Sequence, residues 1–105
     1  MTRNELLSRY AAGERDFSQA DLRGVDLSGA DLAGADFIGA DLSQTDLTGA
    51  MLRGTNFYNA NLAGAILRRA DLSWADLSWA RIVGAVFTGA TVTKGVLESA
   101  IGDEE

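Results

Sequence analysis

The residues of this chain best suited to chemistry are aspartates that recur at a spacing of five. Such a series could hold a cation or supply acid and base groups. Calcium needs six or more oxygens that converge on one point, whereas an even spacing spreads the oxygens over a surface, so we expect no metal site. The series comprises Asp16, Asp21, Asp26, Asp31, Asp36, Asp41 and Asp46.

The composition restricts the other chemistry further. The chain has 105 residues, no cysteine and no histidine. Disulfides, thiolate metal sites, cysteine nucleophiles and the commonest general base are therefore excluded. We expect a protein that is not an enzyme, with no catalytic, metal-binding or cofactor-binding residues and no cofactor.

A five-residue repeat positions these side chains. On an α-helix a period of five would rotate successive residues by about 140°, and on a straight strand it would send alternate residues to opposite faces. The chain must therefore turn once per unit so that each central residue points inward. Every fifth residue is large and apolar: Phe17, Leu22, Leu27, Leu32, Phe37, Leu42, Leu47, Leu52, Phe57, Leu62, Leu67, Leu72, Leu77, Ile82, Phe87, Val92 and Leu97.

Three other positions of the unit support a turn at each corner. Glycine recurs two residues after the centre, which is the third position of a type II turn and needs φ > 0. Alanine recurs two residues before the centre, where a corner leaves little room. The aspartate precedes the centre, and Asn56 and Asn61 take its place later. We interpret this side chain as an acceptor for nearby backbone N–H groups.

Four units make one coil, because Phe17, Phe37 and Phe57 recur at twenty residues. Successive coils would lie about 4.8 Å apart. From about residue 15 to residue 98 the chain resembles the pentapeptide-repeat family, whose repeat is written A(D/N)LXX. The resemblance implies an all-β solenoid, a right-handed quadrilateral β-helix of about four coils, which we expect over residues 15–98.

The two ends need covers because an open coil exposes leucines and unpaired backbone groups. Residues 1–14 are predicted to form an N-terminal capping segment with a short helix over 3–12, since Thr2 and Glu5 have capping-box spacing and Gly13 can end the helix. Near Gly95 the chain could add one more side at Leu97 or form a short helix that presents Val96, Leu97 and Ile101. Residues 99–105 would be a cap or tail, and a homodimer through this end or through an aromatic patch is a hypothesis.

Trp74 and Trp79 stand at the corner position, where glycine is usual, and Arg69 precedes them there. We expect these corners to abandon φ > 0 for type I or distorted turns. In one interpretation Trp74 lies flat over the space left by Gly54, with Lys94 above its ring. In the other, an aromatic and basic patch contacts a partner. Its residues would be Arg68, Arg69, Trp74, Trp79 and Arg81.

Charge divides along the chain and leaves two hypotheses of function. Residues 16–50 carry a net charge of −6 and residues 51–95 a net charge of +3, within an overall −6. The first hypothesis is a cytoplasmic scaffold that binds another protein or a second copy of itself. The second, implied by the family resemblance, is a DNA-mimic inhibitor or protector of DNA gyrase or topoisomerase. We expect no direct binding of nucleic acid or membrane. The second hypothesis would act through an acidic face of Asp21, Asp26, Asp31, Asp36, Asp41 and Asp46.

Overall fold

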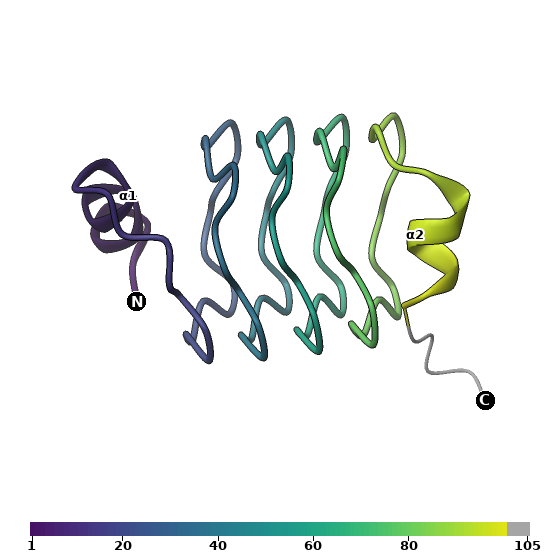
Figure 1. Ribbon diagram of the computed structural model, residues 1–105, viewed down its shortest axis with the longest axis horizontal. Coiled ribbons are helices and arrows are strands. Elements are labelled where there is room, and N and C mark those ends of the chain that lie inside the picture. The colour runs from purple at the N-terminus through teal and green to yellow at the C-terminus, as the bar shows by residue number, and fades with distance from the viewer. Residues whose placement is uncertain (101–105) are drawn as a thin grey trace.

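A stack of coils with one short helix at each end forms the molecule (Figure 1). The computed structural model describes residues 1–100. The helices are α1, Arg3–Ala11, and α2, Lys94–Glu98. Between them, each residue that precedes a centre forms a single parallel bridge with the residue twenty positions later, from Asp16–Asp36 to Asp71–Thr91. The predicted coil of twenty residues is confirmed.

The bridges divide the surface into four faces, which we number in chain order. Face 1 surrounds Phe17, face 2 Leu22, face 3 Leu27 and face 4 Leu32, together with the residues stacked on each. The bridged residues are Asp16, Asp36, Asn56 and Asp76 on face 1, Asp21, Asp41, Asn61 and Arg81 on face 2, Asp26, Asp46, Ile66 and Val86 on face 3, and Asp31, Met51, Asp71 and Thr91 on face 4.

Every corner has the same backbone shape. The residue two positions after each centre has φ between +58° and +75° from Gln19 to Gly89. In the same turns the next residue donates its N–H to the carbonyl of the centre, as Ala30 does to Leu27 at 3.1 Å. A positive φ at the third position and this hydrogen bond are the features of a type II turn. The turn predicted for the glycine corners is confirmed.

The interior is a column of the central side chains. Phe17, Phe37 and Phe57 stack with ring centroids 5.8 and 5.7 Å apart, and the central leucines from Leu22 to Leu77 are buried. The column of central side chains was predicted to be buried as far as Val92. At its C-terminal end, however, Ile82, Phe87 and Val92 are only partly buried. They belong to the last coil, so no further coil covers them.

The residue before each centre accepts a hydrogen bond from the backbone. Oδ1 of Asp36, for example, accepts from the N–H of Ile38 at 2.9 Å, and Oδ1 of Asn56 accepts from the N–H of Tyr58 at 2.9 Å. The acceptor role predicted for this position is confirmed. Because asparagine performs it equally well, the negative charge is not what the turn requires.

Hydrogen bonds lower the pKa of four of these carboxyls. The guanidinium of Arg23 donates to both oxygens of Asp21 at 2.8 Å, which lowers the pKa of Asp21 to about 2. In the other three the largest cause of the lowered pKa is the hydroxyl of a serine two residues later. They are Asp16, Asp26 and Asp71.

We expect the fold to lose stability in acid. A carboxyl whose folded pKa lies below its ordinary 3.8 contributes stability above that value and loses it as the pH falls toward the folded pKa, about 2 for Asp21. Urea midpoints measured from about pH 5 down to about pH 2 should therefore fall. Asp21→Asn keeps the acceptor but does not titrate, so its midpoint should fall less steeply. Parallel curves for the two proteins would contradict this account.

The helix α1 covers the first coil. The predicted capping box is present, since Thr2 Oγ1 accepts from the N–H of Glu5 and the Glu5 carboxylate accepts from the N–H of Thr2. At the other end Gly13, with φ of +100°, ends the helix in a Schellman motif. Leu6 is completely buried in the core cluster. The helix predicted over 3–12 therefore occupies Arg3–Ala11.

The coil gives way to α2 at its C-terminal end. The Thr93 carbonyl accepts from the N–H groups of Val96 and Leu97 at 3.1 and 3.3 Å, and the Thr93 hydroxyl also accepts from Val96. Of the two alternatives for this segment, the helix is the one that forms. Val96 and Leu97 pack partly buried against the core, whereas Ile101 lies outside the described residues.

Candidate interaction surface

The two tryptophans project from the two corners that border face 1 in the fourth coil. Trp74 lies at the corner between faces 4 and 1, and Trp79 lies at the corner between faces 1 and 2. Their exposed fractions are 85% and 60%, the highest among the exposed large hydrophobic residues. Exposed indoles of this kind are unusual on a surface without a binding role, because burial of a large aromatic side chain is favourable.

The corners that hold the tryptophans keep the glycine conformation. Trp74 has φ of +65° and Trp79 has φ of +60°, and Arg69 has φ of +58°. The expected change to type I or distorted turns is therefore wrong. The reason is that each corner is stacked on a corner of the same shape, Gly54 under Trp74 and Asn59 under Trp79, and its own turn bond is kept at 3.0 Å. Neighbouring coils impose the shape at a cost of about 1–2 kcal/mol per non-glycine residue.

At three other corners, Gln19, Gln44 and Arg69, the side chain folds over a glycine of the coil above. A Cβ built on Gly39 would collide with the Gln19 side chain, and one on Gly64 would collide with Gln44. A Cβ on Gly89 would lie 3.3 Å from Cγ of Arg69. These contacts partly compensate for the strained corner because the aliphatic part of the side chain packs on bare backbone.

Trp74 has no such contact with Gly54, the glycine below it, and the residue below Trp79 is Asn59. Nothing lies within 4 Å of a Cβ built on Gly54, so the interpretation in which Trp74 lies flat over that space is wrong. The Lys94 side chain lies outside the described part of the structure. Trp74 is thus both strained and projecting, which is the combination found at functional sites more often than in inert surface.

Face 1 contributes residues that the sequence reasoning did not single out. Tyr58 lies on this face one coil below Ser78, and its exposed fraction is 44%. Asp76 lies between the two tryptophans along the chain and is exposed. The twenty-residue period would have placed Tyr58 beside Trp79. We call Trp74, Trp79 and Tyr58 together the aromatic site.

The arginines predicted to join the tryptophans lie on other faces. Arg68 is on face 3, Arg69 is at the corner between faces 3 and 4, and Arg81 is a bridged residue of face 2. Arg68 and Arg69 are therefore separated from the tryptophans around the rod, because consecutive corners point in different directions. Arg81 follows Trp79 on the face that the Trp79 corner borders, and the aromatic and basic patch stays a prediction.

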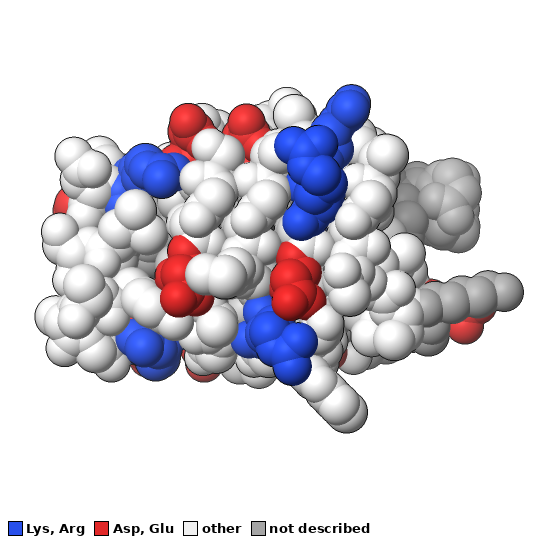
Figure 2. Space-filling view, turned by 90° about the horizontal axis from the view of Figure 1, so that it is seen from above, with Lys and Arg blue, Asp and Glu red and all other residues white. Residues whose placement is uncertain are grey.

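The aspartates of the predicted acidic face do not share one face but surround the N-terminal half of the rod. Asp36 is on face 1, Asp21 and Asp41 on face 2, Asp26 and Asp46 on face 3, and Asp31 on face 4. Stacked aspartates form bridges between the first two coils, as Asp26 and Asp46 do. The face seen in Figure 2 carries acidic and basic groups next to each other. Among the ion pairs of the molecule, the Arg53 guanidinium lies 3.6 Å from the Asp71 carboxylate.

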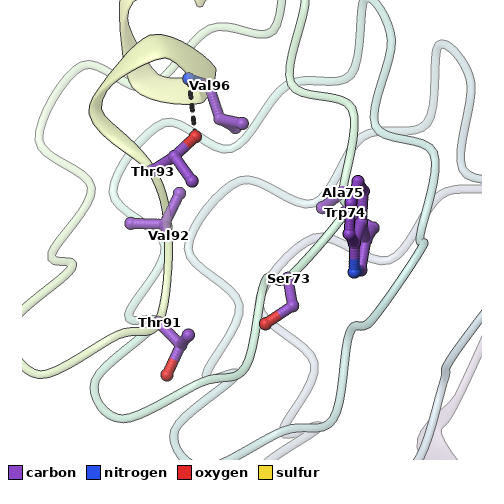
Figure 3. Close-up of a pocket in the computed structure, with 7 residues that line it drawn as sticks. All are labelled: Ser73, Trp74, Ala75, Thr91, Val92, Thr93 and Val96. Carbon is purple, nitrogen blue, oxygen red and sulfur yellow. Dashed lines mark hydrogen bonds between the residues drawn. The ribbon is translucent and has the colours of Figure 1, made fainter.

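A pocket of about 550 Å³ opens beside Trp74 at the C-terminal end. In Figure 3, Ser73, Trp74 and Ala75 lie across the opening from the chain that leads into α2. That second wall consists of Thr91, Val92, Thr93 and Val96. The pocket forms where Thr93 turns its carbonyl into α2, and it extends the aromatic site with an apolar hollow.

The described residues offer neither a cluster of metal ligands nor a helix that could span a membrane. Within residues 1–100, no group of three or more His, Cys, Asp or Glu side chains is arranged to hold a metal ion. Neither described helix has the length and apolar character required to cross a membrane. The cytoplasmic location stays a prediction.

The stacked coils with five-residue sides define a repeat protein, and the chain belongs to the pentapeptide-repeat family. The family model for pentapeptide repeats matches eight copies, over residues 16–49, 30–69, 48–89 and 70–101. A pentapeptide repeat protein from Nostoc PCC 7120 is similar in structure, with a TM-score of 0.88 and 35% identity over 99% of this chain and 88% of that protein.

A second solved structure is that of HetL, a pentapeptide repeat protein involved in heterocyst differentiation regulation in Nostoc sp. strain PCC 7120. It has a TM-score of 0.85 and 43% identity over 86% of this chain, which corresponds to 38% of HetL. No curated protein matches the chain at a significant level.

Proposed function

We propose that the protein is a non-enzymatic scaffold, a right-handed quadrilateral β-helix that binds another protein through the aromatic site. The observation that carries the proposal is the pair of exposed tryptophans held at positive φ. A bulky residue that is kept in a strained conformation and exposed to solvent supports a role outside the molecule. Tryptophan and tyrosine are also the side chains most enriched in binding hot spots.

Replacing both tryptophans by glycine is expected to stabilise the fold and abolish binding. Glycine adopts φ of +60° without strain, and the lost contacts are few because the indoles are exposed. We expect the free energy of unfolding to rise by about 1 kcal/mol per substitution. Urea unfolding measures the first effect, and capture of partners from bacterial lysate measures the second.

The matched control replaces Gln19 and Gln44 by glycine. These corners have φ of +63° and +62°. Gln19 is in the first coil, at the far end of the Trp79 corner column, and Gln44 is at the corner between faces 2 and 3, so the control relieves the same strain but should keep the partner. Loss of stability in the Trp74→Gly, Trp79→Gly variant would show that the indoles support the fold. Equal capture by the wild type and both variants would exclude the aromatic site as the interface.

The alternative, a DNA mimic that binds gyrase or topoisomerase, rests on the ring of aspartates around the first two coils. Duplex DNA carries about one negative charge per 1.7 Å along its whole length, whereas the upper half of this rod is net positive. Replacing Asp31, Asp36, Asp41 and Asp46 by asparagine separates the two functions, because a mimic would lose its target and the aromatic scaffold would keep its partner.

A homodimer through the chain ends is a separate hypothesis. Sedimentation of the same protein preparations tests it.

A further inference from the structure

The charge on face 1 differs from the charge on every other face. Face 2 carries Arg23 and Arg81, face 3 carries Arg68, and face 4 carries Arg53. Between Asp16 and Trp79, face 1 has no outward-facing lysine or arginine among the described residues. Its charged side chains are the carboxylates of Asp16, Asp36 and Asp76.

Carboxylates on the other faces partly neutralise arginines of this chain. Asp21 pairs with Arg23 at 2.8 Å, and Asp71 pairs with Arg53 at 3.6 Å. In the described part of the chain no such ion pair forms with the carboxylates of face 1. Asp76 uses Oδ1 to accept from the N–H of Ser78 at 2.8 Å, which leaves its second oxygen for an external donor.

The exposed aromatic rings of face 1 also lack a described cation. Near α1, by contrast, arginines lie over two rings, Arg15 over Tyr10 at 3.6 Å and Arg9 over the buried Phe17 at 5.2 Å. Among the side chains that the structure describes, which do not include that of Lys94, no arginine or lysine lies over either tryptophan ring. Face 1 therefore combines bare carboxylates with bare aromatic rings, which are the two groups that a guanidinium binds best.

We propose that the partner segment that docks on face 1 is arginine-rich. One guanidinium stacks on Trp74 or Trp79, and a neighbouring one pairs with the Asp76 carboxylate. Lysine would gain less, because its ammonium cannot bind a carboxylate through two parallel hydrogen bonds or stack as a plane. The inference rests on the proposed function and adds the chemistry of the partner.

The two tryptophans make the test direct, because they are the only ones in the chain and both lie at face 1. The probe is a hexa-arginine peptide amide, titrated while indole emission is recorded. We expect saturable binding that a hexa-citrulline peptide of the same shape and no charge does not reproduce. Binding should also weaken as salt is raised.

Two matched variants locate the binding. Asp76→Asn removes a charge on face 1, and Asp46→Asn removes one on the opposite face 3. Both should fold, because asparagine already serves as the acceptor at Asn56 and Asn61, each at 2.9 Å. We expect Asp76→Asn to weaken the binding of hexa-arginine by about fivefold. Asp46→Asn should change the affinity for the peptide by less than about twofold.

Equal weakening by the two variants, or equal affinity for hexa-citrulline, would overturn the inference, since binding would then reflect overall charge or peptide shape. The proposed function fails separately. If lysate capture depends on the tryptophans but not on Asp76, the interface stands and the arginine-rich partner is wrong.

Discussion

Replacement of Phe37 by alanine is expected to lower the free energy of unfolding by about 4 kcal/mol. The ring is completely buried, and it stacks on Phe17 at 5.8 Å and on Phe57 at 5.7 Å. The interior of each coil consists of the central side chains and of small buried residues such as Ala35 and Ala40, so no second layer of large side chains can move in to fill the cavity. Both neighbouring rings would lose a stacking partner, which adds to the loss from the cavity.

Phe87→Ala is the matched control for this substitution. The residue type and its position in the repeat are the same, but Phe87 belongs to the last coil and is only partly buried. We expect a loss of about 2 kcal/mol, because less apolar surface leaves water there. Urea unfolding with a constant slope measures both values. Similar losses for the two variants would show that the upper coil is packed as tightly as the middle of the rod.

The coil could be predicted from the sequence because every unit of the repeat requires the same backbone turn. A period of five with an inward apolar residue requires a corner, and the recurrence of Phe17, Phe37 and Phe57 fixes four corners to a circuit. The bridges from Asp16–Asp36 to Asp71–Thr91 all have the resulting separation. The N-terminal helix was predictable for a different reason, since its capping box is a local signal.

The tryptophan corners were predicted wrongly because turn preferences describe a turn in isolation. For a single turn, a bulky residue at φ of +65° is unfavourable. Trp74 is instead part of a column in which Gly54 below it has φ of +67°, and the bridges on either side of the corner fix its shape. In a repeat protein the shape of a corner is a property of the stack.

The separation of Arg69 from the two tryptophans has a simpler cause. Arg69, Trp74 and Trp79 are consecutive at the corner position, but each step of five residues moves to the next corner of the coil. The twenty-residue period already contained this information, and it would have placed Tyr58 beside the aromatic corners. The start of α2 could not be obtained in this way, because Val96 and Leu97 fit the repeat as well as they fit a helix.

The second large effect is expected at Leu6, which is completely buried where α1 meets the first coil. Leu6→Asp would place a carboxylate in this apolar contact. We expect the helix to detach and the free energy of unfolding to fall by about 4 kcal/mol or more.

Detachment of α1 should also change how the molecules associate. The first coil points carbonyl oxygens toward α1, and α1 supplies the donors. The Met1 amino group donates to Asp21, the Arg3 guanidinium donates to Asp26 and Ser28, and the Tyr10 hydroxyl donates to Ala33 at 2.7 Å. Without the helix these oxygens form an open edge beside exposed leucines, which favours pairing with another chain.

Sedimentation velocity and amide exchange test this role of the helix. Leu6→Asp should sediment as larger species whose proportion rises with protein concentration, and amides of the first coil should lose protection. The control is Ser8→Asp, which adds the same charge at an exposed position of the same helix and should stay like the wild type. A Leu6→Asp protein with normal protection and an unchanged sedimentation coefficient would mean that the first coil closes its own end, and that α1 contributes little to keeping the rods apart.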